Sequence, residues 1–209
     1  MNFTEIYQQF ITDIKHTTLL EYIAVFTGIA SVWYSRKENI LVYPTGLIGT
    51  IIYIYLSFKV GLYGEGSVNF YYTVMSIYGW ILWTRKDTQQ HLVLKITSAT
   101  KKEWLQHIAF CLFFYVVIYA VLFWLKKSHY AKEAIPWADA FASSTAFTGM
   151  WLMAKKKVES WYWWIATNCA SIPLYFVKHY VFTSVYYAVL LIMAFAGLFE
   201  WLKRKETTN

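Results

Sequence analysis

The 209-residue chain is poor in charged residues and in cysteine. Asp, Glu, Lys and Arg make up 15% of it, whereas 58% of the residues are hydrophobic and 21% are aromatic. A soluble domain has about 25% charged residues. The two cysteines, Cys111 and Cys169, lie inside apolar runs and form no CxxC pair, so we expect neither a disulfide framework nor a metal site. The shortage of charge, together with long uncharged runs, indicates an integral membrane protein.

Motifs of catalysis and of phosphate binding are also missing. The sequence has no Gly-x-x-x-x-Gly-Lys-Ser/Thr loop to hold nucleotide phosphates, and no apolar segment pairs histidine with carboxylates. We therefore expect no cofactor, no metal and no enzymatic activity. The three arginines, Arg36, Arg85 and Arg204, all fall at segment ends, so a site at the middle of the membrane would lack the charge that suits a phosphate or carboxylate ligand. The N-terminus shows no basic region or cleavage site of a signal peptide.

What is present is a series of seven apolar segments, each near the ~20 residues needed to cross the hydrocarbon layer. We expect spans near residues 18–34, 40–58, 67–84, 107–125, 136–154, 160–177 and 182–202. Residues 1–16 place Ile6, Phe10 and Ile14 on one face, which is typical of an amphipathic helix lying on the membrane surface. Residues 85–106 are expected to be a solvated cytoplasmic loop, and residues 203–209 a cytoplasmic tail.

The distribution of lysine and arginine predicts the orientation. With seven spans, thirteen of the 19 Lys and Arg residues fall on one face of the membrane and six on the other. The positive-inside rule makes the richer face cytoplasmic, so we expect the N-terminus outside and the C-terminus inside. The Lys and Arg residues lie in short clusters between apolar runs. The net charge of +7 therefore indicates contact with the lipid bilayer and no nucleic-acid partner.

Three stretches recur later in the chain, at an offset of 119 residues between Lys59 and Lys178 and of 118 between Trp83 and Trp201. Residues 33–39 resemble 153–160, residues 56–63 resemble 175–182, and residues 78–85 resemble 196–203. The pattern predicts two three-helix repeats, 18–84 and 136–202, joined by a connector helix at 107–125. An even number of crossings separates the copies, so they lie parallel. Parallel repeats with the substrate between them are one of the transporter architectures.

Two expected spans carry aromatic and polar residues at helical spacing, and these are the candidate substrate-binding residues. The residues on the 160–177 span are Trp161, Trp164 and Asn168, and those on the 67–84 span are Asn69, Tyr72, Ser76 and Trp80. A polar side chain in a membrane helix faces protein, water or ligand, so the stripes either pack helices or line a binding site. A cage of indoles and phenols suits an aromatic cation or a nucleoside. Asp139 is a further candidate, with capping of a neighbouring helix as the alternative.

These motifs resemble those of the PnuC family of bacterial vitamin transporters. Val158-Glu-Ser-Trp-x-x-Trp-x-x-x-Asn168 is similar to the family's Glu-Asn-Trp-x-x-Trp-x-x-x-Asn/Asp segment. Ile77-Tyr-Gly-Trp80, followed by Trp83, is similar to its Ile-Tyr-Gly-Trp-x-x-Trp. Pro136-Trp-Ala-Asp139 resembles its Pro-x-Trp-Asp with the order shifted.

The resemblance implies an all-α polytopic membrane protein with seven transmembrane helices in a 3+1+3 arrangement, related to the SWEET sugar carriers. It implies a homotrimer in the bacterial inner membrane. The implied activity is facilitated diffusion of nicotinamide riboside, which a cytoplasmic kinase traps by phosphorylation, with Trp161, Trp164 and Asn168 contacting the substrate. Other relatives carry thiamine or riboflavin. Members associated with nicotinamide riboside have Gln at the place of Asn69 and Asn at that of Ser76, so these alternatives stay open.

Two other classes of function are weighed against a transporter. An integral membrane enzyme acting on lipids needs a His/Asp/Ser constellation at one membrane face, which the sequence does not show. A non-catalytic membrane subunit or sensor would be favoured if the aromatic stripes only pack helices. The internal repeat and the missing catalytic groups favour the transporter.

Overall fold

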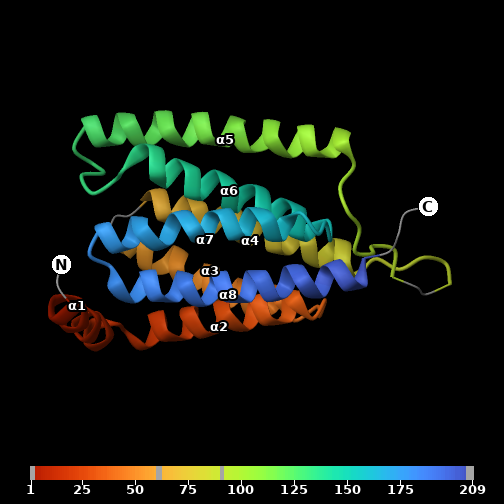
Figure 1. The fold of residues 1–209 in the computed structure, drawn as a ribbon, viewed down its shortest axis with the longest axis horizontal. Coiled ribbons are helices and arrows are strands. Elements are labelled where there is room, and N and C mark those ends of the chain that lie inside the picture. Colours follow the sequence, from red (N-terminus) through yellow and green to blue (C-terminus); the bar gives the residue numbers. More distant parts are fainter. Residues whose placement is uncertain (1–2, 60–62, 90–91, 206–209) are drawn as a thin grey trace.

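The computed structural model describes residues 3–59, 63–89 and 92–205, and in these ranges the chain is all-helical (Figure 1). The helices are α1 (Phe3–His16), α2 (Leu19–Arg36), α3 (Val42–Lys59), α4 (Tyr63–Thr84), α5 (Lys101–Lys127), α6 (Pro136–Ala154), α7 (Ser160–Val177) and α8 (Val181–Arg204). A helix therefore lies at each of the seven segments expected to span the membrane.

The clearest difference in helix bounds is the start of α5, which was expected near residue 107 and begins at Lys101. The cause is a capping box. The Glu103 amide donates to Thr100 Oγ1 at 3.3 Å, and the Thr100 amide donates to Glu103 Oε2 at 2.7 Å. These two bonds satisfy backbone donors that the first turn leaves without partners. The loop expected over 85–106 therefore ends at Thr100.

Six of the long helices form a closed ring. Along it, α2 packs on α3, α3 on α4, α4 on α6, α6 on α7, α7 on α8, and α8 back on α2. Within the described ranges α3 and α7 do not pack against each other, so they stand on opposite sides of the ring. Helix α5 lies outside the ring against α6, and α1 runs across the helix ends beside α8 (Figure 1).

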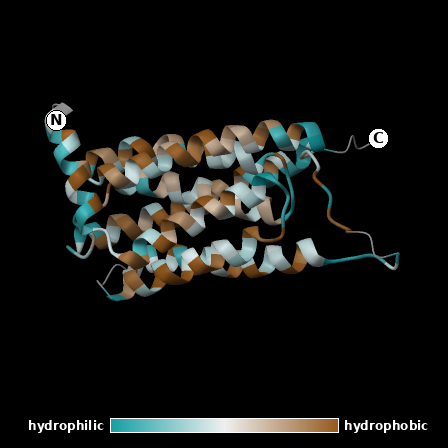
Figure 2. Cartoon of the chain, turned by 90° about the horizontal axis from the view of Figure 1, so that it is seen from below, coloured by the Kyte–Doolittle hydropathy of each residue, from teal (hydrophilic) through white to brown (hydrophobic). Residues whose placement is uncertain are grey.

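The outer surface of this bundle is apolar over most of its length. Within the described residues, α5 and α8 are the two helices long and apolar enough to cross a membrane by length and composition. In α5 the large side chains of Leu105, Phe113 and Val116 are exposed. Figure 2 shows hydrophobic residues along the long helices and hydrophilic ones mainly in the connections and on α1. An apolar surface of this extent is covered by lipid, so the chain is a membrane protein.

The connection before α5 is only partly solvated, which differs from the expectation. Arg85 to Gln89 are exposed, but Ile96 is 3% exposed. The Thr97 amide donates to the Lys156 carbonyl at 3.2 Å, and the Val158 amide donates to the Thr97 carbonyl at 3.0 Å. Backbone pairing and burial of Ile96 thus fix this part of the connection against the turn between α6 and α7.

Candidate functional site

One face of α4 lines the interior of the ring from end to end. Its members follow helical spacing and are Glu65, Asn69, Tyr72, Ser76, Gly79 and Trp83. Exposure falls along this face: Glu65 is exposed, Asn69 and Tyr72 are half-buried, and Ser76, Gly79 and Trp83 are buried. Solvent therefore reaches the end of the face that lies nearer α1, named here the outer end, and is excluded from the opposite end. Trp80, a candidate from the sequence, lies beside this face and is 38% exposed, so the structure does not bring it to the other candidates.

Tyr72 and Trp164 meet where α4, α6 and α7 converge. Their ring centroids are 6.4 Å apart, and the Tyr72 ring lies edge-on to Phe147 of α6 at 6.0 Å. A Cβ atom added at Gly149 would lie 3.2 Å from Trp164 Cε2. The indole therefore lies directly over the α6 backbone, where a Cβ atom would force it to shift by a few tenths of an ångström.

Trp161 and Asn168 share a helix face with Trp164 but lie in different surroundings. Trp161 is 1% exposed, and its ring stands perpendicular to Trp201 with centroids 5.6 Å apart. Asn168 is also buried. The neighbouring Thr167 hydroxyl lies 2.9 Å from the Thr145 hydroxyl, which joins α7 to α6. Asn168 lies one helical turn after Trp164 on the same face of α7, whereas Trp161 packs into an aromatic core at the end of the ring away from α1.

That core closes the end of the ring away from α1 with four aromatic rings. Tyr43 stands edge-on to Trp83 at 5.2 Å, and Trp83 lies 6.2 Å from Trp201. Trp161 completes the group through Trp201. Tyr43 and Trp161 lie 118 residues apart in the sequence, as do Trp83 and Trp201.

A buried ion pair stands beside these rings. Lys156 is 2% exposed, and its Nζ lies 2.6 Å from Glu38 Oε1, 3.0 Å from the Leu94 carbonyl and 4.7 Å from the centroid of the Trp83 ring. Glu38 and Lys156 have left-handed backbones, with φ of 57° and 52°, and are 118 residues apart. Ser35 and Met153, also 118 apart, touch at 2.9 Å between Oγ and Sδ.

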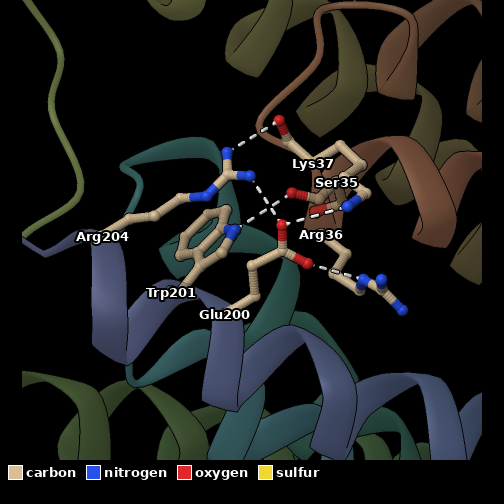
Figure 3. A network of polar contacts seen from close by, with 6 residues as sticks. All are labelled: Ser35, Arg36, Lys37, Glu200, Trp201 and Arg204. Atoms are coloured by element: carbon tan, nitrogen blue, oxygen red, sulfur yellow. Dashed lines mark hydrogen bonds and ion pairs between the residues drawn. The ribbon is translucent and has the colours of Figure 1, made fainter.

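Glu200 joins the C-terminal ends of α2 and α8 (Figure 3). Its carboxylate accepts from Arg36 Nε at 2.7 Å, from Lys37 Nζ at 3.3 Å and from Arg204 Nη2 at 2.6 Å. Beside it, Trp201 Nε1 donates to the Ser35 carbonyl at 3.1 Å. These contacts hold α8 to α2 on the side of the ring opposite the contact between α4 and α6.

Asp139 lies at the outer end of the ring. Its Oδ2 accepts from the Ile135 amide at 2.7 Å, and its Oδ1 lies 2.7 Å from Lys178 Nζ. The carboxylate therefore caps the start of its own helix α6, whereas the alternative weighed above was capping of a neighbouring helix, and it pairs with the cation that follows α7. Asn69 donates through Nδ2 to the Glu65 carbonyl of its own helix at 3.0 Å.

Sequence reasoning missed a tyrosine cluster near this outer end. Tyr175 and Tyr187 stack with centroids 5.2 Å apart and planes 13° apart, and Tyr186 lies 5.6 Å from Tyr187. The cluster therefore draws on α7 and α8. A signal was present, because Tyr175 follows Asn168 by two helical turns on the same face of α7.

Comparison with known proteins identifies the family. Residues 18–203 match the model of a family described as nicotinamide mononucleotide transporter. The chain belongs to the nicotinamide mononucleotide transporter family. This assignment confirms the family resemblance drawn from Trp-x-x-Trp-x-x-x-Asn and Ile-Tyr-Gly-Trp, and makes the chain a member of a family of membrane transporters.

Two known transporters and one solved structure are similar to this chain over most of its length. The nicotinamide riboside transporter PnuC of Escherichia coli (strain K12) is 23% identical over 202 residues, which cover 88% of this chain and 84% of that protein. The riboflavin/roseoflavin transporter RibM of Streptomyces davaonensis is 21% identical over 200 residues, 95% of this chain and 92% of that one. The crystal structure of the vitamin B3 transporter PnuC has a TM-score of 0.71 and 25% identity, covering 95% of this chain and 87% of that one.

Proposed function

We propose that this chain carries nicotinamide riboside across the bacterial inner membrane by facilitated diffusion. The observation that carries the proposal is the contact of Tyr72 with Trp164 inside the helix ring, with Asn168 one turn further along the same face of α7, in a family whose named relatives transport vitamins. Two aromatic faces and an amide suit a flat, cationic ring with a polar substituent. Nicotinamide riboside is such a molecule, since its ring nitrogen carries a positive charge.

The charges along the ring favour the unphosphorylated riboside over the mononucleotide. Of the lysines near the two ends of the interior, Lys156 is paired with Glu38 and Lys178 with Asp139. A phosphate is best held by arginine or lysine that can donate to it. Neither of these lysines can do so without giving up its carboxylate. Phosphorylation by a cytoplasmic kinase would therefore trap the substrate after entry.

For the architecture we propose two parallel repeats, α2–α4 and α6–α8, with α5 as connector, as in SWEET carriers. The order of helices around the ring supports this, because α2 packs on α8 and α4 on α6, contacts that a twofold axis along the bundle exchanges. Residues 118 apart meet near that axis at Ser35 and Met153 and at Glu38 and Lys156. Rocking of the two units would expose the site alternately. We further propose a homotrimer with the N-terminus outside and the C-terminus in the cytoplasm.

Direct binding tests the proposed substrate. Purified full-length protein is titrated with nicotinamide riboside, thiamine, riboflavin and nicotinamide mononucleotide while tryptophan fluorescence is followed. We expect saturable quenching by nicotinamide riboside and none by the mononucleotide. Tighter binding of thiamine or riboflavin would assign the chain to one of those substrates, a choice that the short side chains of Asn69 and Ser76 keep open. Quenching by none of the four would refute a vitamin carrier.

Replacing Trp164 or Asn168 by alanine is expected to weaken binding of nicotinamide riboside. The loss should be about tenfold for Trp164→Ala, because a desolvated cation–π contact contributes ~1–2 kcal/mol. Isothermal titration calorimetry measures it without depending on the indole as a probe. Trp137→Ala is the matched control, since Trp137 is 65% exposed at the start of α6. Equal affinities for the Trp164 and Trp137 variants would leave Trp164 with a packing role alone.

A further inference from the structure

Gly46 of α3 stands where the second half of the chain has Trp164. The two positions are 118 residues apart, the offset that relates the two halves of the chain in the aromatic core. Trp164 lies over Gly149 of α6, and the residue 118 before Gly149 is Ser31 of α2. The first half of the chain therefore has no side chain at the position where the second half has an indole.

Two serine hydroxyls flank the space over Gly46. A Cβ atom added at Gly46 would lie 3.0 Å from Ser31 Oγ of α2 and 3.9 Å from Ser76 Oγ of α4. Gly46 thus faces both of the helices that pack on α3. It is only half-buried, whereas Gly49 is buried against the α2 backbone. Close packing on α2 therefore explains the glycine at position 49, but Gly46 keeps open space beside it.

The hydroxyls around this space can still form hydrogen bonds. Ser76 is 2% exposed, and in the part of the chain that the structure describes its hydroxyl has no hydrogen-bond partner. Ser31 Oγ donates to the Val42 carbonyl at 2.8 Å, and its lone pairs can accept a further bond. The Tyr43 hydroxyl, which lies against Gly79, is also buried without a partner among the described residues. Because buried hydroxyls without partners are costly, this set of groups suits a ligand that carries hydroxyls.

The space over Gly46 lies next to the aromatic pair described above. Ser76 follows Tyr72 by four residues on the interior face of α4, which is about 6 Å along the helix. Tyr72 in turn lies 6.4 Å from Trp164. The first half of the chain thus supplies room and hydroxyls, and the second half supplies an aromatic face. This division matches a molecule with a flat ring at one end and a polyhydroxylated group at the other.

We propose that Gly46, Ser31 and Ser76 form a subsite for the ribosyl group of the substrate, beside the Tyr72–Trp164 pair that holds its ring. The inference rests on the proposed function and adds to it the residues that select for the sugar. Ser76 exchanges a hydrogen bond with one ribosyl hydroxyl, and Ser31 accepts from another. Gly46 leaves the room that the sugar occupies, so a side chain at this position would exclude it.

The test compares two ligands that share the cationic ring and differ in the sugar. Nicotinamide riboside carries a ribosyl group on its ring nitrogen, and 1-methylnicotinamide carries a methyl group there. Affinities of both for the full-length protein are measured by isothermal titration calorimetry, the weaker ligand by displacement of the stronger. The variants are Ser76→Ala, Gly46→Ala and Ser184→Ala. Ser184 is the matched control, because it is a buried serine of α8 whose hydroxyl donates to the Ile172 carbonyl at 2.9 Å.

We expect Ser76→Ala to weaken binding of the riboside about fivefold, through the loss of one hydrogen bond. Gly46→Ala should weaken it about tenfold, because the added methyl group takes up room that the sugar needs. Both variants should leave the affinity for 1-methylnicotinamide within about twofold of the wild type, since that ligand has no sugar to lose contact with. Ser184→Ala should leave both affinities within the same margin.

Three results would overturn this inference. Equal losses for the two ligands, or no loss of riboside binding in Ser76→Ala, would refute the subsite while leaving the proposed carrier intact. If the wild type binds only the riboside, equal riboside affinities in Ser76→Ala and Ser184→Ala would refute the subsite in the same way. A wild type that binds neither ligand would overturn the proposed function and this inference together.

Discussion

Replacing Gly197 by alanine is expected to destabilise the protein severely. A Cβ atom at this position would lie 2.4 Å from Trp161 Cη2 and within 2.6 Å of two further atoms of the same ring. The ring has nowhere to move, because Trp161 is buried against Trp201. Overpacking a rigid core costs about 3 kcal/mol, so the midpoint of thermal unfolding in detergent should fall by roughly 10 °C.

Two other glycines provide the comparison. Gly79 lies 118 residues before Gly197, and a Cβ there would approach Tyr43 to 2.4 Å, so Gly79→Ala should cost about as much. Gly46 is the mild case, since the nearest atom to its added Cβ is Ser31 Oγ at 3.0 Å, the end of a short side chain. If Gly46→Ala lowered the midpoint as far as Gly197→Ala, the close approach of helix and indole would not be the cause.

Replacing Lys156 by methionine is expected to have the second large effect. The substitution keeps the length of the side chain and removes the charge, so Glu38 loses its partner at 2.6 Å and the Leu94 carbonyl loses a donor. Breaking a buried ion pair costs ~3–5 kcal/mol. We expect about 3 kcal/mol, the low end of that range, because the Glu38 side chain keeps 27% of its exposure to water.

Lys157→Met is the matched control for Lys156. Lys157 Nζ lies 2.7 Å from Glu103 Oε1 with both side chains partly exposed, and such pairs contribute ~1 kcal/mol or less. Thermal unfolding of the two variants in the same detergent should separate them by several degrees. Equal midpoints would mean that the pair between Lys156 and Glu38 adds no more than a surface contact. The result is independent of the transported substrate.

The sequence predicted the helices well because membrane spans are long, apolar and bounded by charge. Each expected segment coincides with a helix, and the main shift, at α5, comes from a capping box formed by Thr100 and Glu103. The three lysines after α6 are a case in which the charge pattern predicted the surroundings of the side chains wrongly. Counting them as topogenic charges treats them as solvated, yet Lys156 is buried and Lys155 lies 4.1 Å from the centre of the Trp151 ring. Partial burial lowers the pKa of Lys155.

The candidate site was predictable only within a single helix. Periodicity placed Trp161, Trp164 and Asn168 on one face of α7, and Asn69, Tyr72 and Ser76 on one face of α4. It could not show that Trp164 lies over Gly149 while Trp161 packs against Trp201. Residues on one face of a long helix contact different neighbouring helices along its length, and periodicity does not reveal which. The tyrosine cluster was missed because it joins two helices, α7 and α8, and pairing between helices leaves no mark in local spacing.

The meeting of Glu38 with Lys156 has a consequence for any attempt to make the two halves of the chain alike. Glu38 and Lys156 both have a left-handed backbone conformation and form an ion pair between the two halves of the chain. A tandem chain of two first halves would set glutamate against glutamate there, and one of two second halves would set lysine against lysine. Like charges buried in contact repel each other strongly. We therefore expect the first half of the chain to pack more stably against the second half than against a copy of itself.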